Sequence, residues 1–340
     1  MRNQTPMSSP PRKKNRPRLG LYLKERDVEV VATLWRYRLL RESALHRLCF
    51  PSVKHQRKVQ ARLKKLADEG YVGRRFPVMV HRSNTGYTDY THQDRREVLY
   101  WIERRGVEEV INGGRPLDEE QQERLRYIKN LSERSEAYLN HRLDLADLRA
   151  CLELAVAQTP GVLLAVWYDE HEKAGEDPIL QARVKIRLPD TDRERPFTLC
   201  PDACFVLEDE KSSKQDLFFV EVDEGTESAR KRWRDKVLAY CAYAGQGFDK
   251  RFAFRGKGFR VLTVTRSQKG KDQASRKARL LRTTYRAGGR GQFWFATFDQ
   301  VMPDGTVTGE HFLTRGIWQR AREEDIRKKA EIVLYNHLFI

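Results

Sequence analysis

Long apolar runs are absent from this sequence. No stretch reaches the about eighteen apolar residues that a membrane-spanning helix needs, and residues 1–20 contain no apolar signal core. These absences argue against an integral membrane protein and against a secretory leader. We therefore expect a cytoplasmic protein with no membrane partner.

Cysteine is scarce as well. The five cysteines are scattered and odd in number, and most lie inside apolar runs, which is typical of reduced core thiols. Cys200 and Cys204 stand close together, but no second Cys/His pair occurs at zinc-finger spacing. The sequence therefore disfavours a structural zinc site.

Acidic residues are outnumbered by basic ones. Against 48 Asp and Glu stand 65 Lys and Arg, which gives a net charge of +17 and an isoelectric point near 9.7. A positive surplus of this size usually faces a polyanion, and nucleic acid is the leading candidate. The length of 340 residues suits two domains.

The first third of the chain predicts a DNA-binding domain at 25–112, preceded by a disordered basic arm at 1–24. Three helices are expected, the first capped by Asp27 and the third ended by Gly70. The apolar stripe of the third helix consists of Val59, Leu63 and Leu66. Residues 71–102 then read as a β-hairpin. This order predicts a winged helix-turn-helix.

The third of these helices is the predicted recognition helix. Its basic side chains turn away from the apolar stripe, and further basic residues stand at the base of the hairpin. The predicted DNA-binding residues are Lys54, His55, Arg57, Lys58, Arg62, Lys65, Arg74 and Arg75. A solvated helix face is the alternative, but the helix order and the overall charge favour binding of double-stranded DNA.

A helical linker at 113–133 leads to a second domain at 134–340. Its pattern predicts a long helix, three strands, a helix and a fourth strand, so the order is αβββαβ. The four strands are expected at 161–170, 197–207, 217–223 and 259–267. A further basic helix, a fifth strand and a C-terminal helix are expected at 274–286, 291–298 and 322–339. The chain thus predicts a two-domain protein of the α+β or α/β class.

Three carboxylates in the middle of this domain stand out. Glu221 and Asp223 lie two apart on one strand and so share a face, and Asp202 joins that face if its strand pairs alongside. Acids that gather in this way repel one another unless a cation lies among them. Mg²⁺ or Mn²⁺ prefers such oxygen ligands, so these three residues are the predicted metal ligands. A turn residue and a solvated strand face are the ordinary alternatives.

The residues "PDACF" and "VEVD" within this order resemble the PD-(D/E)xK nuclease superfamily and its restriction-endonuclease-like core. Pro201 and Asp202 match the first half of the motif and Glu221 matches its acid, but Asp223 stands where the lysine belongs. The winged helix together with "PDACFVL", "FFVEVDEGTES" and "KVLAYCAY" is similar to the replication-relaxation family of plasmid and mobile-element proteins, over roughly residues 25–300. Membership implies a role in relaxation, mobilisation or replication of such DNA.

Lys236 is the candidate for the missing catalytic cation. It lies on the helix that follows the acidic strand, so its ammonium can reach the carboxylates, and the resemblance also places a lysine four residues before a tyrosine there. The predicted catalytic set is Asp202, Glu221, Asp223 and Lys236. His141 lies on an apolar helix stripe and reads as a core histidine more than a catalytic one.

Two functions from different classes remain open at this stage. The first is a Mg²⁺-dependent DNA endonuclease aimed by the winged helix. The second is an inactive accessory factor that serves as a platform for DNA or for a relaxase or replication protein. A homodimer is compatible with either.

Overall fold

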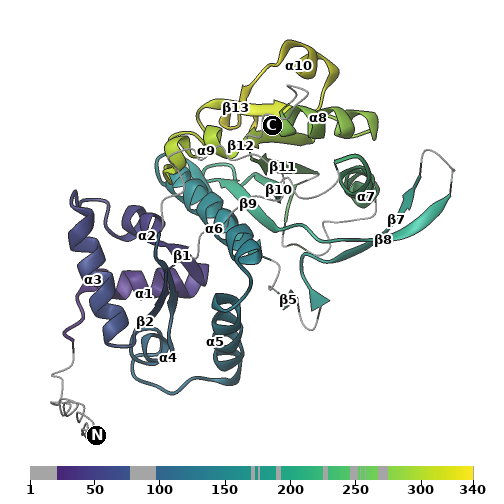
Figure 1. Cartoon of the computed structure of the whole chain (residues 1–340). Helices are drawn as coiled ribbons and strands as arrows, with labels where there is room; N and C mark the ends of the chain where they lie inside the picture. The colour runs from purple at the N-terminus through teal and green to yellow at the C-terminus, as the bar shows by residue number, and fades with distance from the viewer. Residues whose placement is uncertain are drawn as a thin grey trace, which may run out of the picture.

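The computed structural model shows two lobes, with the long helix α6 (Glu136–Ala157) at their junction (Figure 1). The structure describes residues 21–76, 97–169, 173–174, 177–188, 193–224, 229–245, 252, 254–256, 258–266 and 275–339. Most of the predicted basic arm and the tip of the predicted hairpin, residues 77–96, lie outside this set. Within it, no helix is both long and apolar enough to cross a bilayer.

The N-terminal lobe, residues 21–111, combines short helices with one small antiparallel sheet. Its main elements are α1 (Glu25–Tyr37), β1 (Leu39–Arg41), α2 (Glu42–Cys49), α3 (Gln56–Asp68), β2 (Val72–Arg75) and β3 (Leu99–Ile102). The sheet has the order β1-β3-β2, and β2 and β3 pair with Val72 opposite Ile102. The short strand β1 was not expected from sequence, because three residues between two helices carry no alternation to detect.

Helix α1 begins earlier than the sequence suggested. Lys24 is its N-cap residue, and Asp27 lies inside the first turn, where its carboxylate accepts a hydrogen bond of 2.7 Å from the Lys24 backbone N–H. Asp27 therefore caps the helix from the third helical position, as the acidic member of a capping box does.

Helix α3 confirms the predicted stripe. Val59, Leu63 and Leu66 are buried, and Gly70 follows the helix with a φ of 80°, a conformation that glycine adopts without steric cost. Burial of this stripe leaves the opposite side of α3 in solvent.

The helix α5 (Glu119–Ser132) connects the lobes, and the C-terminal lobe, residues 136–339, contains a seven-stranded mixed sheet. The longer helices and the main-sheet strands of this lobe are α6 (Glu136–Ala157), β4 (Val162–Asp169), β9 (Ala203–Asp209), β10 (Gln215–Asp223), α7 (Arg234–Ala244), β11 (Phe259–Thr265), α8 (Arg276–Arg286), β12 (Phe293–Thr297), β13 (Gly316–Arg320) and β14 (Ile332–Val333). Strands β4, β9 and β10 form an antiparallel meander, and β11 pairs in parallel with β10. The predicted αβββαβ order is therefore present among the main-sheet elements, with two small two-stranded sheets inserted between β4 and β9.

The strand expected at 197–207 is two strands in two different sheets. Residues Glu194–Leu199 form β8, which pairs with β7 (Ala182–Arg187) in a separate ribbon, and β9 begins only at Ala203. Pro201 lies at the break, where its missing N–H removes a ladder donor. The ribbon projects from the body at the right of Figure 1.

The C-terminal helix expected at 322–339 was also wrong in extent. Glu323–Lys328 is α-helical, as α10, and Lys329 then adopts a left-handed φ of 51°. The chain continues into β14, which pairs with β13 at the edge of the main sheet. For the two residues of β14, pairing at the edge of the sheet outweighed their helix propensity.

The main sheet is covered on both faces. Helix α6 lies against one face and shares a core with it, which includes Leu145, Leu148 and Leu152, spaced three and four residues apart along one side of the helix. Helices α7 and α8 and the β7–β8 ribbon cover the other face. The first core continues into the N-terminal lobe through Leu34 and Leu63, so the two lobes share one apolar interior.

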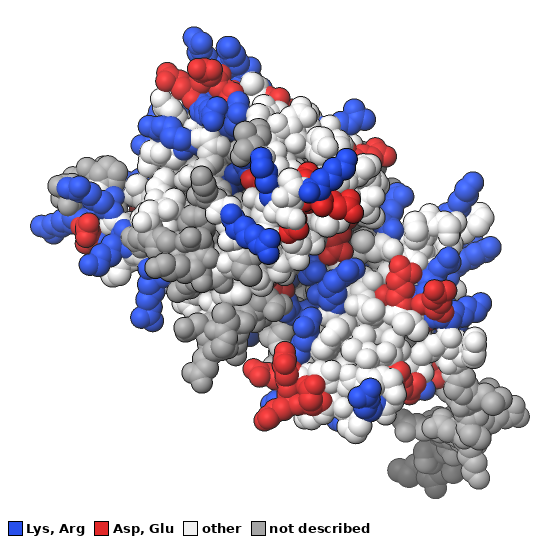
Figure 2. Space-filling view, turned by 180° about the vertical axis from the view of Figure 1, so that it is seen from behind, with Lys and Arg blue, Asp and Glu red and all other residues white. Residues whose placement is uncertain are grey.

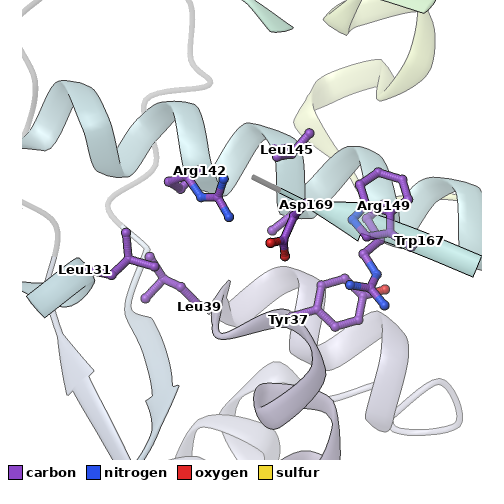
Figure 3. A pocket seen from close by; sticks show the side chains of 9 residues that line it. Tyr37, Leu39, Leu131, Arg142, Leu145, Arg149, Trp167 and Asp169 are labelled. Carbon is purple, nitrogen blue, oxygen red and sulfur yellow. The ribbon is translucent and has the colours of Figure 1, made fainter. Parts of the chain in front are cut away.

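Buried ion pairs connect the lobes beside this core. Arg38, which follows α1, pairs with Asp169 at the end of β4, and both side chains are less than one tenth exposed. Arg41 of β1 reaches Asp144 and Asp147 on α6. A cavity of only about 20 Å³ remains between the lobes, lined by Tyr37, Arg142, Asp169 and their neighbours (Figure 3). That volume accommodates about one water molecule and no substrate.

Candidate functional site

Asp202 is held beside Glu221 by the backbone of β10. The Asp202 N–H donates to the carbonyl of Val220 at 3.1 Å, and the Val222 N–H donates to Asp202 Oδ2 at 2.7 Å. Asp202 thus supplies β10 with the donor and the acceptor that a neighbouring strand would provide, at the point where Pro201 interrupts the pairing. Its other oxygen, Oδ1, lies 3.3 Å from His141 Nε2 on α6.

Glu221 is buried beneath α7. Its two carboxylate oxygens receive different donors, Lys236 Nζ at 2.5 Å and the Tyr240 hydroxyl at 2.6 Å. Lys236 and Tyr240 stand one helical turn apart, so they present their polar ends together. The structure therefore places Lys236 against the acidic strand as predicted, with Glu221 as its partner instead of Asp223.

Burial and charge act in opposite directions on these acids. Burial raises the pKa of Glu221 to about 7, in spite of the nearby Lys236 ammonium. Burial also opposes ionisation of Asp202, but the hydrogen bond and charge of His141, together with the Lys236 charge, hold its pKa below the ordinary value. Asp202 and Glu224 in turn raise the pKa of His141, against the effect of burial. The site thus favours a charged Asp202–His141 pair beside a carboxyl that titrates near neutrality.

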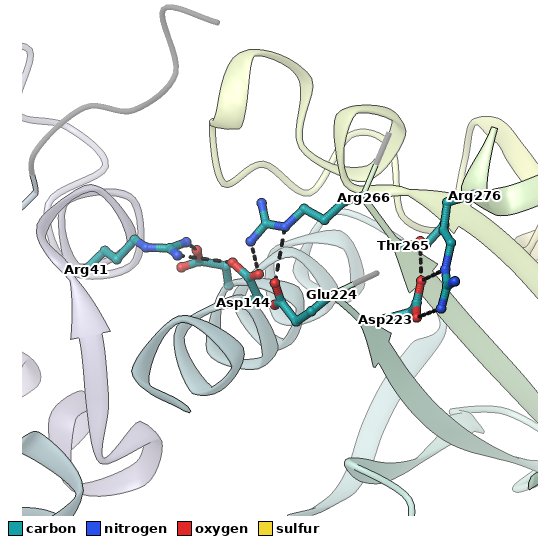
Figure 4. Close-up of polar contacts among 8 residues, drawn as sticks. Arg41, Asp144, Asp223, Glu224, Thr265, Arg266 and Arg276 are labelled. Atoms are coloured by element: carbon teal, nitrogen blue, oxygen red, sulfur yellow. Dashed lines mark hydrogen bonds and ion pairs between the residues drawn. The ribbon is translucent and has the colours of Figure 1, made fainter. Parts of the chain in front are cut away.

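Asp223 has separate partners. Arg276, the first residue of α8, donates two hydrogen bonds to its two oxygens at 2.8 and 2.7 Å, and the Thr265 hydroxyl donates a third at 2.6 Å (Figure 4). Both side chains of the Asp223–Arg276 pair are largely buried. Sequence reasoning missed Arg276, although β11 lies beside β10 and leads into α8, which brings the start of that helix to Asp223.

Each of the three acids has a basic partner of its own, although Asp202 and Glu221 lie close enough for the Asp202 charge to raise the pKa of Glu221. Among the described residues, no group of three or more His, Cys, Asp and Glu side chains is arranged to hold a metal ion. Each carboxylate already accepts hydrogen bonds from an internal donor, and a divalent ion needs those same oxygens. A Mg²⁺ or Mn²⁺ ion at the predicted site would therefore compete with these internal donors for the carboxylate oxygens.

A second ion network lies between this region and the N-terminal lobe. Arg41 and Arg266 share Asp144, and Arg266 also approaches Glu224 at 3.7 Å (Figure 4). Asp147, also on α6, contacts Arg41. Sequence reasoning missed this network because Asp144 is 103 and 122 positions away from Arg41 and Arg266, and no local pattern links them.

The basic residues predicted to bind DNA separate into two groups. Those exposed on or just before α3 are Lys54, His55, Arg57, Lys58 and Lys65. Arg62, Arg74 and Arg75 have protein partners instead. Arg62 Nε donates to the buried Asp27 carboxylate at 2.6 Å, Arg74 lies 3.9 Å from Asp68, and Arg75 Nη1 donates to the Ser132 carbonyl at 2.8 Å. The right edge of Figure 2, where the N-terminal lobe lies, carries Lys and Arg side chains.

Comparison with known proteins identifies the family. A search of curated proteins returned no significant match, and neither did a search of solved structures. The family model described as replication-relaxation matches residues 32–254, which is more than half of the chain and includes both α3 and the three acids. On this match, the chain belongs to the replication-relaxation family.

Proposed function

We propose that this protein binds duplex DNA through α3 and serves the replication or relaxation of plasmid or mobile-element DNA. The observation that carries the proposal is the solvent-facing basic side of α3, on which Arg57, Lys58 and Lys65 are exposed while the apolar stripe is buried. Family membership supports the biological role.

The N-terminal lobe supports a winged helix as the DNA-binding fold. Its order of helix, strand, two helices and two paired strands, with the sheet order β1-β3-β2, is what that fold requires. In such a domain the recognition helix enters the major groove, and basic side chains near its start contact phosphates and base edges. Lys54, His55, Arg57 and Lys58 lie at this end of α3.

The paired arginines have a different task in this proposal. Arg62 holds α3 against α1 through Asp27, and Arg75 fixes β2 to the C-terminal end of α5. They set the orientation of the exposed residues, and only the exposed residues contact DNA.

The test compares two triple variants in gel-shift or anisotropy titrations over a range of salt concentrations. Arg57→Ala, Lys58→Ala and Lys65→Ala together should weaken binding and lower the salt slope by roughly three, since each lost phosphate contact contributes about 0.9. Arg315→Ala, Arg327→Ala and Lys328→Ala remove the same charge from exposed positions elsewhere and serve as the control. Equal binding by the two variants would refute the assignment of α3.

The C-terminal lobe supports a restriction-endonuclease-like core in the role of a platform. Its meander β4-β9-β10, helix α7 and parallel β11 follow that fold, but the acids are engaged by internal cations. We infer an accessory factor that brings DNA to a relaxase or replication protein. Family membership supports partners of this kind.

A metal-dependent nuclease is the second candidate, and one observation favours it. Lys236 lies 2.5 Å from Glu221, close to Asp202, which is where a nuclease of this type needs a cation. Supercoiled DNA with and without Mg²⁺ or Mn²⁺ distinguishes the candidates. Cleavage that falls by orders of magnitude in both Lys236→Ala and Lys236→Arg supports the nuclease, and no cleavage by the parent protein supports the platform.

A further inference from the structure

The β7–β8 ribbon has two chemically different faces. Ala182, Val184 and Ile186 of β7 are buried in the same core as Val237 and Tyr240 of α7. The alternate residues Arg183, Lys185 and Arg187 are exposed, as expected for a strand whose side chains point to opposite faces in turn. An apolar face therefore anchors the ribbon, and a basic face is presented to solvent.

The partner strand adds little negative charge to this face. In register with the three basic residues stand Thr198, Pro196 and Glu194. Glu194 is the one acid among the described residues of the two strands, and Arg193, just before β8, is exposed as well. Figure 2, turned by 180° from Figure 1, shows Lys and Arg side chains along the projection at its left edge. The outer face is thus strongly positive.

An ion pair and a shared core join the ribbon to the helix that carries Lys236. Arg195 of β8 pairs at 2.6 Å with Asp235 of α7, which is buried. Lys236 is the next residue on that helix and contacts Glu221. The ribbon lies on the side of the molecule away from α3 (Figure 1).

We propose that the β7–β8 ribbon is a second DNA-binding element, which contacts the phosphate backbone or major groove of a duplex through Arg183, Lys185 and Arg187. The inference shares its ligand class with the proposed function but rests on different residues. The DNA major groove is wide enough for a two-stranded ribbon, and alternate residues about 7 Å apart along one strand form a line of positive charge suited to phosphates. None of the large apolar side chains exposed among the described residues lies on the ribbon, so a membrane-inserting anchor is missing there.

The test uses the full chain and a duplex of about 40 base pairs, long enough for more than one contact region of about one helical turn. Arg183→Gln, Lys185→Gln and Arg187→Gln together should weaken binding by about tenfold or more and reduce the salt slope by roughly three. Arg183→Lys, Lys185→Arg and Arg187→Lys keep the charge and should bind like the parent. The variant at Arg315, Arg327 and Lys328 is again the control for net charge.

The outcomes distinguish this inference from the proposed function. Loss of binding in the glutamine variant with retention in the charge-keeping variant supports the ribbon, whatever the α3 variant does. Parent-like affinity and salt slope in the glutamine variant overturn the ribbon assignment, even if the α3 variant fails to bind. Equal losses in the ribbon and control variants overturn it as well, because net charge alone would then explain the effect.

Discussion

The Asp223–Arg276 pair offers the sharpest test of how the acidic strand works. Arg276 meets both oxygens of Asp223, and the side chains are only 6% and 11% exposed. If Asp223 is a structural partner, Arg276→Met leaves a carboxylate buried with the Thr265 hydroxyl as its remaining donor. If Asp223 is instead a metal ligand, Arg276 is dispensable to the fold.

The magnitude follows from the burial of both partners. Removing one member of a buried ion pair typically costs about 3–5 kcal/mol, because the remaining charge has lost its compensation. We expect this range for Arg276→Met, which leaves the negative charge of Asp223 unpaired. We expect the same range for Asp223→Asn, which leaves the positive charge of Arg276 unpaired. The double variant leaves no orphan, so it should cost about 3 kcal/mol less than the sum of the single variants.

Urea unfolding of the four proteins, with thermal melting in parallel, measures this coupling. Each single variant should melt roughly 6 °C or more below the parent. Arg282→Met, an exposed arginine on the same helix, should stay within about 0.5 kcal/mol of the parent. Additive single effects, or single effects no larger than that of Arg282→Met, would refute the structural pair.

Three further predictions follow from described contacts. Arg62→Ala should destabilise the protein by about 3 kcal/mol in urea unfolding while leaving the DNA salt slope unchanged, because the buried Asp27 loses its cation and keeps only the Lys24 N–H as a donor. A changed slope with unchanged stability would show instead that Arg62 contacts DNA. Burial raises the pKa of Asp147 to about 7, so its protonation stabilises the fold fully below about pH 4, and this contribution is lost as the pH rises to about 7; Asp147→Asn should flatten that fall in a stability–pH profile, and a parallel profile would contradict the assignment. Gly73→Ala should cost about 1–3 kcal/mol, because its Cβ would come within 2.2 Å of the Trp101 ring, and a melting temperature equal to that of the parent would show that the ring yields freely.

The sequence by itself determined the order of the main elements and the placement of several cores. Periodicity located α3 with its stripe of Val59, Leu63 and Leu66, and located the inner face of α6. It also determined that Glu221 and Asp223 share a strand and that Lys236 follows on a helix within reach. These features are local, since side-chain periodicity along one element fixes which residues share a face.

Tertiary structure decided how those residues are partnered. Residues 194–199 belong to the ribbon because the strand breaks at Pro201. No alternation pattern in the sequence distinguishes these residues from the strand that follows. Arg276 pairs with Asp223 and Arg62 pairs with Asp27, across sequence separations of 53 and 35 residues. Long-range ion pairs leave no periodic signal in a sequence, and a chain with 65 basic residues offers many equivalent candidates. Only the approach of the start of α8 to the end of β10, and of α3 to α1, selects which cations are enclosed with an acid and which remain exposed.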